Sequence, residues 1–327
     1  MSVKHLVNNN NLIAFLKPNP LVSTGFDSII DDWLARFISP LTRCSYRHAI
    51  FEFFSTLNSD GYSAELLAQF LCLEATQAYE LVSKYHGTLI ERGLAPGTIN
   101  QRLTVVRSLV NYATEIGKCH YNLANLKMER VSSYRDTTGI STDSFKLMLS
   151  AVDRSTLRGK RDYAILLLLW GNALRRAEVT SCNVKDFDAH EKTLSILGKG
   201  KGKQAQKVTL GSNTVNCIQE WLNARGNSKP DEPLFYAVHI GYYGHRLNND
   251  SVYKIVKKYA KLASIQKNLS PHRIRHSSIT AALDATNGDV RAVQKLSRHS
   301  SINTLMIYDD NRRNEQGRVT SILEDLL

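Results

Sequence analysis

The sequence predicts a mainly α-helical protein with two domains, a helical one followed by an α+β one that contains a small β-hairpin or sheet. The chain has 327 residues, which is long for one domain and ordinary for two. Apolar residues recur at helical spacing through most of the chain, and a period of two appears only within 192–210. Hydrophobic residues make up 43% and charged residues 22%, which excludes wholesale disorder.

The first domain is predicted over 26–126 as an all-helical unit. It follows a loose polar leader at 1–25, which lacks the apolar core of a signal peptide. Apolar residues follow helical spacing in separate segments that end at glycine or turn residues, and no strand pattern interrupts them. The segments predicted as helices are 26–37, 39–58, 64–72, 75–92 and 98–117.

A polar segment at 127–141 predicts an interdomain linker, and the second domain is predicted over 142–327. Apolar residues alternate before and after a glycine- and lysine-rich turn, at Leu194 and Ile196 and again at Val208 and Leu210, which predicts a hairpin. The predicted helices are 143–152, 161–172, 175–182, 213–224, 251–262, 276–286, 290–296, 302–308 and an amphipathic tail at 318–327.

The charge distribution indicates a polyanionic partner, with nucleic acid as the first expectation. The chain carries a formal charge of +12; residues 1–135 have 13 Lys and Arg against 11 Asp and Glu, and residues 136–327 have 29 against 19. Five cysteines without C-x-x-C spacing predict neither a disulfide framework nor a zinc site. The longest strongly apolar run, 163–170, is too short to span a bilayer, so we expect a soluble cytoplasmic protein with no membrane partner.

Two arginine motifs stand out in the second half of the chain. The first, A-L-R-R-A-E at 173–178, places Arg175 three residues before Glu178. The second, H-R-I-R-H at 272–276, places His272 and Arg275 on one face of a helix. Taken singly, the first is typical of an ion pair at a helix start, and the second of a solvated helix start.

Two further motifs complete the set. G-K-G-K-G-K at 198–203 forms the expected hairpin turn, where glycine brings lysine close to a phosphate. S-R-H at 297–299 is followed nine residues after His299 by Tyr308. Taken singly, the first of these motifs is typical of a basic surface turn, and the tyrosine of the second is typical of a packed side chain.

In this order and spacing the motifs resemble the tyrosine recombinases, a family that includes phage integrases and Xer-type resolvases. The family has an Arg in G-L-R-x-x-E, a hairpin Lys in G-K-G, then H-x-L-R-H, then L-G-H with a Tyr nine residues beyond. The resemblance covers about residues 26–310. The departures are Ala173 for Gly, Ser297-Arg298 for Leu-Gly, and Thr209 and Leu123 for prolines.

The resemblance implies a site-specific DNA recombinase that cleaves and rejoins strands through a 3′-phosphotyrosyl intermediate, with no metal, ATP or other cofactor. Tyr308 is then the nucleophile, and a covalent intermediate conserves the phosphodiester for rejoining. Arg175 and Arg275 would donate forked hydrogen bonds to the phosphate. His299 would bind the phosphate, and His272 would assist proton transfer at the tyrosine.

The resemblance also assigns supporting roles. Lys199 is the expected general acid for the leaving 5′-oxygen. The doubled G-K-G leaves the choice between Lys199 and Lys201 open, because counting back from the second strand favours Lys201. Glu178 and Asp186 are expected to be structural supports.

By the same resemblance, 26–126 is a core-binding (SAM-like) DNA-binding domain and 142–327 the catalytic domain with a C-terminal helix. Candidate DNA contacts are Lys201 and Lys203 of the hairpin turn and four residues that are equally explained as solvated surface residues, Arg43, Arg47, Gln101 and Arg102. The implied partners are a double-stranded recombination site and further copies of the chain, forming a tetramer on two sites, with unknown helper proteins. The implied location is the nucleoid. The C-terminal helix would either pack on its own domain or, as we favour, dock on a neighbour.

Two other functions fit part of the pattern. A type IB topoisomerase shares the nucleophile, but that class usually has Lys where this chain has His272, which favours a recombinase. A non-enzymatic DNA-binding relative is disfavoured because Tyr308 and both arginines are present. The DNA target and the choice among integration, excision, resolution and inversion leave no readable pattern.

Overall fold

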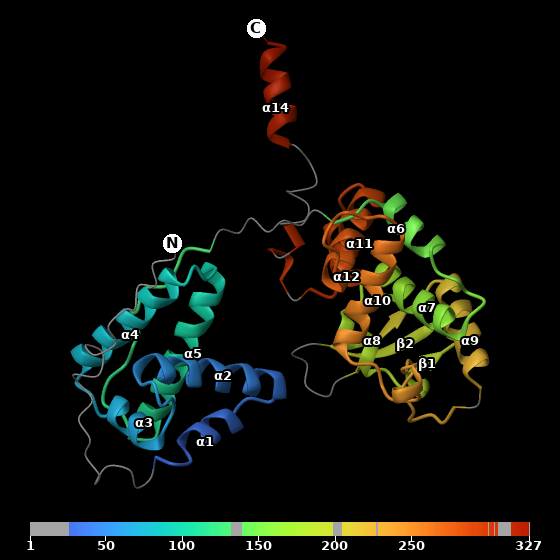
Figure 1. Cartoon of the computed structure of the whole chain (residues 1–327). Helices are drawn as coiled ribbons and strands as arrows, with labels where there is room; N and C mark the ends of the chain where they lie inside the picture. The colour runs from blue at the N-terminus through green and yellow to red at the C-terminus, as the bar shows by residue number, and fades with distance from the viewer. Residues whose placement is uncertain are drawn as a thin grey trace, which may run out of the picture. The chain divides into compact units, whose positions relative to one another are not determined.

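The computed structural model describes residues 26–131, 139–198, 205–226, 228–299, 301–303, 305–306 and 315–326. The chain divides into two compact units, Met1–Ser132 and Ser133–Leu327 (Figure 1). The boundary falls within the segment predicted as a linker. The assignment of DNA-binding and catalytic roles to the two units remains a prediction.

The first unit contains helices joined by turns and no strand within its described residues, in agreement with the sequence pattern. Serine side chains cap α2 and α3, and proline occupies the first turn of α2 and α5, which are ordinary helix-start signals. The apolar faces of these helices enclose one core, which includes the fully buried Trp33, Phe53 and Tyr85. The elements are α1 (Ile29–Ala35), α2 (Pro40–Leu57), α3 (Ala64–Leu71), α4 (Ala75–Glu91) and α5 (Pro96–Glu115) (Figure 1).

The first residues of the predicted linker lie against this helical unit. Asn100 on α5 makes two hydrogen bonds with the backbone of Glu129, at 2.8 and 2.9 Å. The Glu129 carboxylate is 2.8 Å from Nε2 of His86 on α4. Met128 also packs on the first core. Polar composition alone therefore did not show that this stretch is held by side chains of α4 and α5.

The second unit is built around a buried helix, as the apolar run at 163–170 predicts. This helix, α7, packs against α9 and α11 and is covered on most of its surface. It begins at Leu157, four residues before the predicted start, because the Thr156 hydroxyl caps it. The helices are α6 (Thr142–Ser150), α7 (Leu157–Gly171), α8 (Arg176–Ser181), α9 (Ser212–Arg225), α10 (Asn249–Leu262), α11 (Pro271–Ala285), α12 (Val290–Ser297) and α14 (Glu315–Glu324).

The predicted hairpin belongs to a three-stranded antiparallel sheet in the order β1 (Phe187–Asp188), β2 (Thr193–Leu197), β3 (Ala205–Thr209). Leu194 pairs with Val208, and these residues are buried with Ile196 on one face. The strand β1 was missed because two residues are too few to show alternation. The connection between β2 and β3, which holds the G-K-G-K turn, lies outside the described residues.

The start of α11 was predicted wrongly, and the difference matters for the site. The helix begins at Pro271 rather than at His276, with the Ser270 hydroxyl accepting from the backbone N–H of Arg273 at 3.2 Å. His272 and Arg275 therefore both lie in its first turns. Within the described residues, no helix is long and apolar enough to cross a membrane.

A buried ion pair joins α7 to its neighbours. Arg161 donates to the Asp162 carboxylate at 2.6 and 3.0 Å and to the carbonyl of Tyr236 at 2.9 Å. The Tyr259 hydroxyl on α10 donates to the second Asp162 oxygen at 3.0 Å. Burial, and then the charge of Asp162, raise the pKa of Tyr259. Both charges are satisfied, so losing one partner leaves the other buried and uncompensated.

We expect Asp162→Asn to lower the free energy of unfolding by about 3–5 kcal/mol, because Arg161 would keep its charge without its partner. The matched control is Glu220→Gln, which breaks the solvent-exposed Arg154–Glu220 pair of 2.7 Å and should cost less than about 1 kcal/mol. Urea denaturation of the full chain, followed by circular dichroism, measures both. Equal losses in the two variants would contradict this account of the buried pair.

Candidate active site

The loop between α7 and α8 places Arg175 beside a buried carboxylate. Arg175 caps α8, and Glu178 in the first turn accepts from the Arg175 backbone N–H and from its Nη1, both at 2.8 Å. The Glu178 side chain is only 2% exposed, whereas that of Arg175 is 30% exposed. Glu178 thereby makes one half of a capping box, the bond from the N3 side chain to the N-cap backbone N–H, and its second oxygen holds the Arg175 guanidinium, which has no acceptor for the other half.

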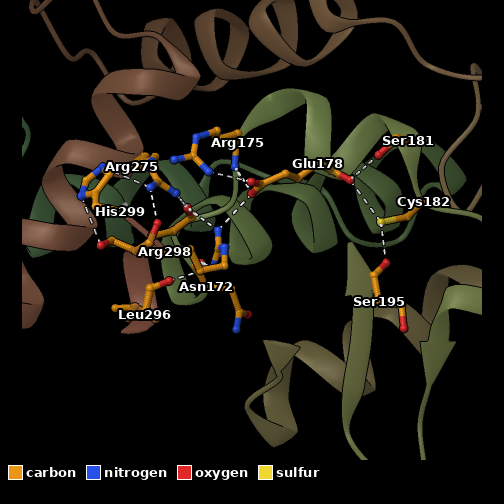
Figure 2. A network of polar contacts seen from close by, with 12 residues as sticks. Asn172, Arg175, Glu178, Ser181, Cys182, Ser195, Arg275, Leu296, Arg298 and His299 are labelled. Atoms are coloured by element: carbon orange, nitrogen blue, oxygen red, sulfur yellow. Dashed lines mark hydrogen bonds and ion pairs between the residues drawn. The ribbon is translucent and has the colours of Figure 1, made fainter. Parts of the chain in front are cut away.

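Arg275 reaches the same loop from α11. Its side chain is 1% exposed, and it donates to the carbonyls of Ala173 and Ser297 and, at 3.3 Å, to Nε2 of His299. Figure 2 shows Arg275 and His299 close to one another and to Arg175. Arg275 therefore connects the α7–α8 loop to the segment that follows α12.

His299 is held in one tautomer by its neighbours. A guanidinium only donates, so Nε2 accepts from Arg275, and the ring proton lies on Nδ1, which donates to Ser297 Oγ at 3.2 Å. Burial is the largest cause that lowers the pKa of His299 to about 4, and the charges of Arg275, Arg175 and Arg298, and then His272, contribute to the same shift. His299 is therefore neutral at pH 7 and lies in a strongly positive environment.

Arg298 is a member of this network that sequence reasoning did not select. It ends α12 with a positive φ of 56°, at the position where the family pattern has glycine, and its side chain is 6% exposed. Its guanidinium donates to the carbonyls of Asn172 and Leu296 and to Glu178 Oε2. The only sequence signal was the departure from the L-G-H pattern.

His272 also lies near this group, on the first turn of α11. Its Nε2 is 2.8 Å from Nε2 of His276, and the two rings meet edge to face with centroids 4.3 Å apart. One of these nitrogens must carry the proton and the other accept it. His276 was not predicted to take part, although it lies in the same H-R-I-R-H motif.

Four of the predicted site residues, Tyr308, Lys199, Lys201 and Lys203, lie outside the described residues. Three residues before Tyr308, Leu305 is fully buried in a small apolar cluster with Ala173, Ile279, Leu283 and Val293. That cluster packs Leu305 against α11, α12 and the α7–α8 loop.

Asp186 does not join the arginine network shown in Figure 2. Its carboxylate accepts from the backbone N–H of Asn183 at 2.7 Å and closes the short 3₁₀ turn Val184–Asp186. This contact orders the chain just before the sheet, which is consistent with a supporting role.

The four candidate DNA contacts of the first unit lie on α2 and α5 and each has a partner within the protein. Arg47 pairs with Asp31 at 2.6 Å, and Arg43 donates to the carbonyl of Phe37 at 2.6 Å. Gln101 donates to Ser45 at 3.3 Å.

The fourth candidate, Arg102, is the least available. It pairs with Glu52 at 2.6 Å and its side chain is 17% exposed. Glu52 also pairs with Arg92 at 2.8 Å, which makes this a partly buried structural group. The assignment of all four residues to DNA binding remains a prediction.

The arrangement in the second unit can bind an anion with several acceptor oxygens. Arg175, Arg275 and Arg298 carry three positive charges, and Glu178, the carboxylate that contacts two of them, removes only one. That excess of positive charge contributes to the depressed pKa of His299. Guanidinium forks matched to tetrahedral oxyanions favour a phosphate.

Comparisons with known proteins agree with this chemistry. The model of the phage integrase family matches residues 140–315. A tyrosine recombinase of Synechocystis sp. is 47% identical over 312 residues, which cover 95% of this chain and 99% of that protein. The tyrosine recombinase XerC of Yersinia pestis is 30% identical over 275 residues, covering 84% and 86%.

Solved structures share the fold at low identity. The XerH recombinase bound to its difH substrate, in a pre-cleavage complex, aligns with a TM-score of 0.60 at 21% identity, over 86% of this chain and 80% of that one. A lambda integrase fragment bound as a dimer to a core site aligns with a TM-score of 0.61 at 13% identity, over 84% and 95%. By its family match and its full-length relatives, the chain belongs to the tyrosine recombinases of the phage integrase family.

Proposed function

We propose that this chain recombines DNA at specific sites by attack of Tyr308 on a phosphodiester, leaving a 3′-phosphotyrosyl bond and a free 5′-hydroxyl. The 5′-hydroxyl of a second strand then attacks that bond and rejoins the DNA. One covalent bond is exchanged for another at each step, so rejoining requires no ATP. The family membership supports the reaction class, and the roles of individual residues are our assignments.

The observation that carries the proposal is the convergence of Arg175, Arg275 and His299 in one network of the second unit (Figure 2). The transition state of phosphoryl transfer gathers negative charge on its equatorial oxygens. Donors already fixed in place, as Arg275 is by two backbone carbonyls, need not reorganise when that charge develops. The excess positive charge of this site is complementary to the negative charge of that transition state.

Proton transfers are assigned to the remaining residues. His272, on the first turn of α11, would exchange a proton with the Tyr308 hydroxyl. Lys199, or Lys201 in the same turn, would protonate the leaving 5′-oxygen. Two guanidiniums and a lysine would supply the charge that a metal ion supplies in other phosphoryl-transfer enzymes, so we expect the reaction to proceed in a chelator.

The duplex is proposed to be held by both units, with α2 and α5 of the first contributing contacts from Arg43, Arg47, Gln101 and Arg102. Solved relatives were crystallised on DNA, XerH on difH and lambda integrase as a dimer on a core site, which supports a DNA recombination site as the partner. Such an enzyme would act at the nucleoid in the cytoplasm, with any helper proteins still to be identified.

Covalent trapping tests the proposed function. The protein is mixed with sheared DNA of its own genome in EDTA, quenched in detergent, and the DNA linked to protein is sequenced. We expect adducts at a few sites with the wild type and none with Tyr308→Phe, since the variant lacks the attacking oxygen.

The distribution of adducts separates the alternatives. Adducts spread evenly over the DNA would instead indicate a topoisomerase of type IB. Tight binding with no adduct at all would contradict the enzymatic assignment and favour a non-catalytic DNA-binding protein.

Arg175→Ala should reduce cleavage of the recovered site by about 100- to 1,000-fold, because one preorganised donor to the phosphate is lost. Binding to a single site should change by less than about fivefold, since many other phosphate contacts remain. Arg176→Ala is the matched control, because this neighbouring arginine is exposed. Rates come from quenched adduct formation and affinities from gel shifts; a cleavage rate in Arg175→Ala equal to that of the control would remove Arg175 from the catalytic set.

The last helix supports assembly of several protomers. Along α14, Val319, Ile322 and Leu323 are 48–58% exposed, and Leu326 beyond its end is 76% exposed. An amphipathic helix with its apolar stripe exposed suits docking on a second copy. We propose that this contact contributes to a tetramer on two DNA sites.

Ile322→Asp should then weaken the pairing of two DNA sites by at least about tenfold, because a buried apolar contact is replaced by a charge. Ser321→Asp is the control, since it adds the same charge on the polar side of the helix. Deletion of Val319–Leu327 should act like Ile322→Asp. Single-site binding and two-site synapsis are measured by gel shift and by analytical ultracentrifugation; an equal loss of both activities would count against docking in trans.

A further inference from the structure

Arg298 occupies a position that disfavours an arginine in two ways. Its backbone is left-handed, with φ at 56°, a conformation that glycine adopts freely and that other residues adopt at an energetic cost. Its side chain is 6% exposed, and burial lowers the pKa of its guanidinium while Glu178 opposes that shift. The residue must therefore be held by the contacts it makes.

Those contacts reach two separate segments. Nη1 donates to the carbonyl of Asn172 at 3.1 Å, and Nη2 donates to that of Ala173 at 3.2 Å, so the guanidinium fixes the α7–α8 loop. Nη2 also donates to Glu178 Oε2 at 3.0 Å. Ala173 itself has a positive φ of 45°, and its carbonyl accepts from Arg275 as well.

The contact with Glu178 determines the charge that Arg175 presents. Glu178 accepts from Arg175 with both carboxylate oxygens, one from Nη1 and one from the backbone N–H. With Arg175 as its only cation, this buried carboxylate would cancel the charge of that guanidinium. With Arg298 as a second cation, the three groups keep a net charge of +1.

Arg298 also fixes the residue that follows it. Its backbone N–H donates to the carbonyl of Gln294 at 2.7 Å, and the Gln294 amide donates to the carbonyl of His299 at 3.1 Å. Together with the side-chain contacts, these bonds set the direction in which the chain leaves α12. The position of the His299 ring relative to Arg275 depends on that direction.

We propose that Arg298 is a positioning residue for cleavage, which neutralises Glu178 so that Arg175 remains available to the DNA phosphate and which aligns His299 with Arg275. It contacts no reacting atom in this assignment. The inference rests on the proposed function and deepens it, because it explains why a buried arginine replaces the glycine of the family pattern.

Arg298→Gly tests the proposal, because glycine takes the left-handed backbone without strain and removes only the side chain. Asn287→Gly is the matched control, since Asn287 is exposed and also left-handed, with φ at 52°. We expect Arg298→Gly to bind the DNA duplex recovered by trapping within about threefold of the wild type and to form the tyrosyl adduct about 10- to 100-fold more slowly. The control should match the wild type in both.

Chemical rescue separates positioning from a purely structural role. Guanidinium ion, at concentrations far below those that unfold the protein, should restore part of the adduct rate of Arg298→Gly, with sodium at equal ionic strength giving no rescue. Arg298→Lys should stay slower than the wild type, since an ammonium group lacks the fork that reaches Glu178 and the loop carbonyls together.

The outcomes are distinguishable. No adduct with the wild type would overturn the proposed function and this inference with it. A wild-type adduct together with an unchanged rate in Arg298→Gly would overturn this inference alone. A third outcome would also overturn this inference alone. In it, Arg298→Gly forms the adduct slowly, guanidinium does not restore the rate, and the rate falls only in proportion to the folded fraction of the variant, measured by urea denaturation.

Discussion

The buried carboxylate of Glu178 is the contact on which the site depends. It accepts hydrogen bonds from the Arg175 backbone N–H at the start of α8 and from the Arg175 guanidinium, which it orients. It also accepts from the guanidinium of Arg298, at the end of α12. A carboxylate that is 2% exposed is costly unless it is paired and hydrogen-bonded, so these partners are not interchangeable with solvent. The α7–α8 loop, whose carbonyls at Asn172 and Ala173 are both held by Arg298, is arranged around this requirement. Helices that are more than a hundred residues apart in sequence thereby meet at one point.

Much of the fold was readable because helix starts and apolar stripes are local signals. Ser39 with Pro40 predicts α2, and the apolar run after Tyr163 predicts a buried α7. The errors are also local in origin. The start of α11 was placed five residues late, at His276, although Ser270-Pro271 is a strong local helix-start signal. The strand β1 is two residues long and leaves no periodicity to detect.

The site was predictable to the extent that its members lie in ordered motifs. Arg175, Arg275 and His299 were selected because the order and spacing of their motifs resemble those of the tyrosine recombinases, and all three lie in one network. Arg298 was not selected, because its importance arises from a contact with Glu178, 120 residues earlier in the chain, which no spacing reveals. Ser297 was likewise noted only as a departure, yet its hydroxyl accepts from Nδ1 of His299 in the tautomer that Arg275 imposes. Departures from a family pattern at such a place indicate where the structure holds additional contacts.

The tautomer of His299 has a consequence for DNA recognition. A phosphate oxygen only accepts hydrogen bonds, and Nε2 of His299 is an acceptor while Arg275 donates to it. Nε2 of His299 can therefore donate to a phosphate oxygen in only two cases. In the first, the ring gains a proton. In the second, the ring proton moves from Nδ1 to Nε2, and the Ser297 hydroxyl turns from the Gln294 carbonyl toward the ring. In the first case the complex takes up a hydrogen ion, because the anion raises the pKa from about 4, and affinity then increases as the pH falls. In the second case no ion is exchanged, and the heat of association is the same in buffers of different ionisation enthalpy.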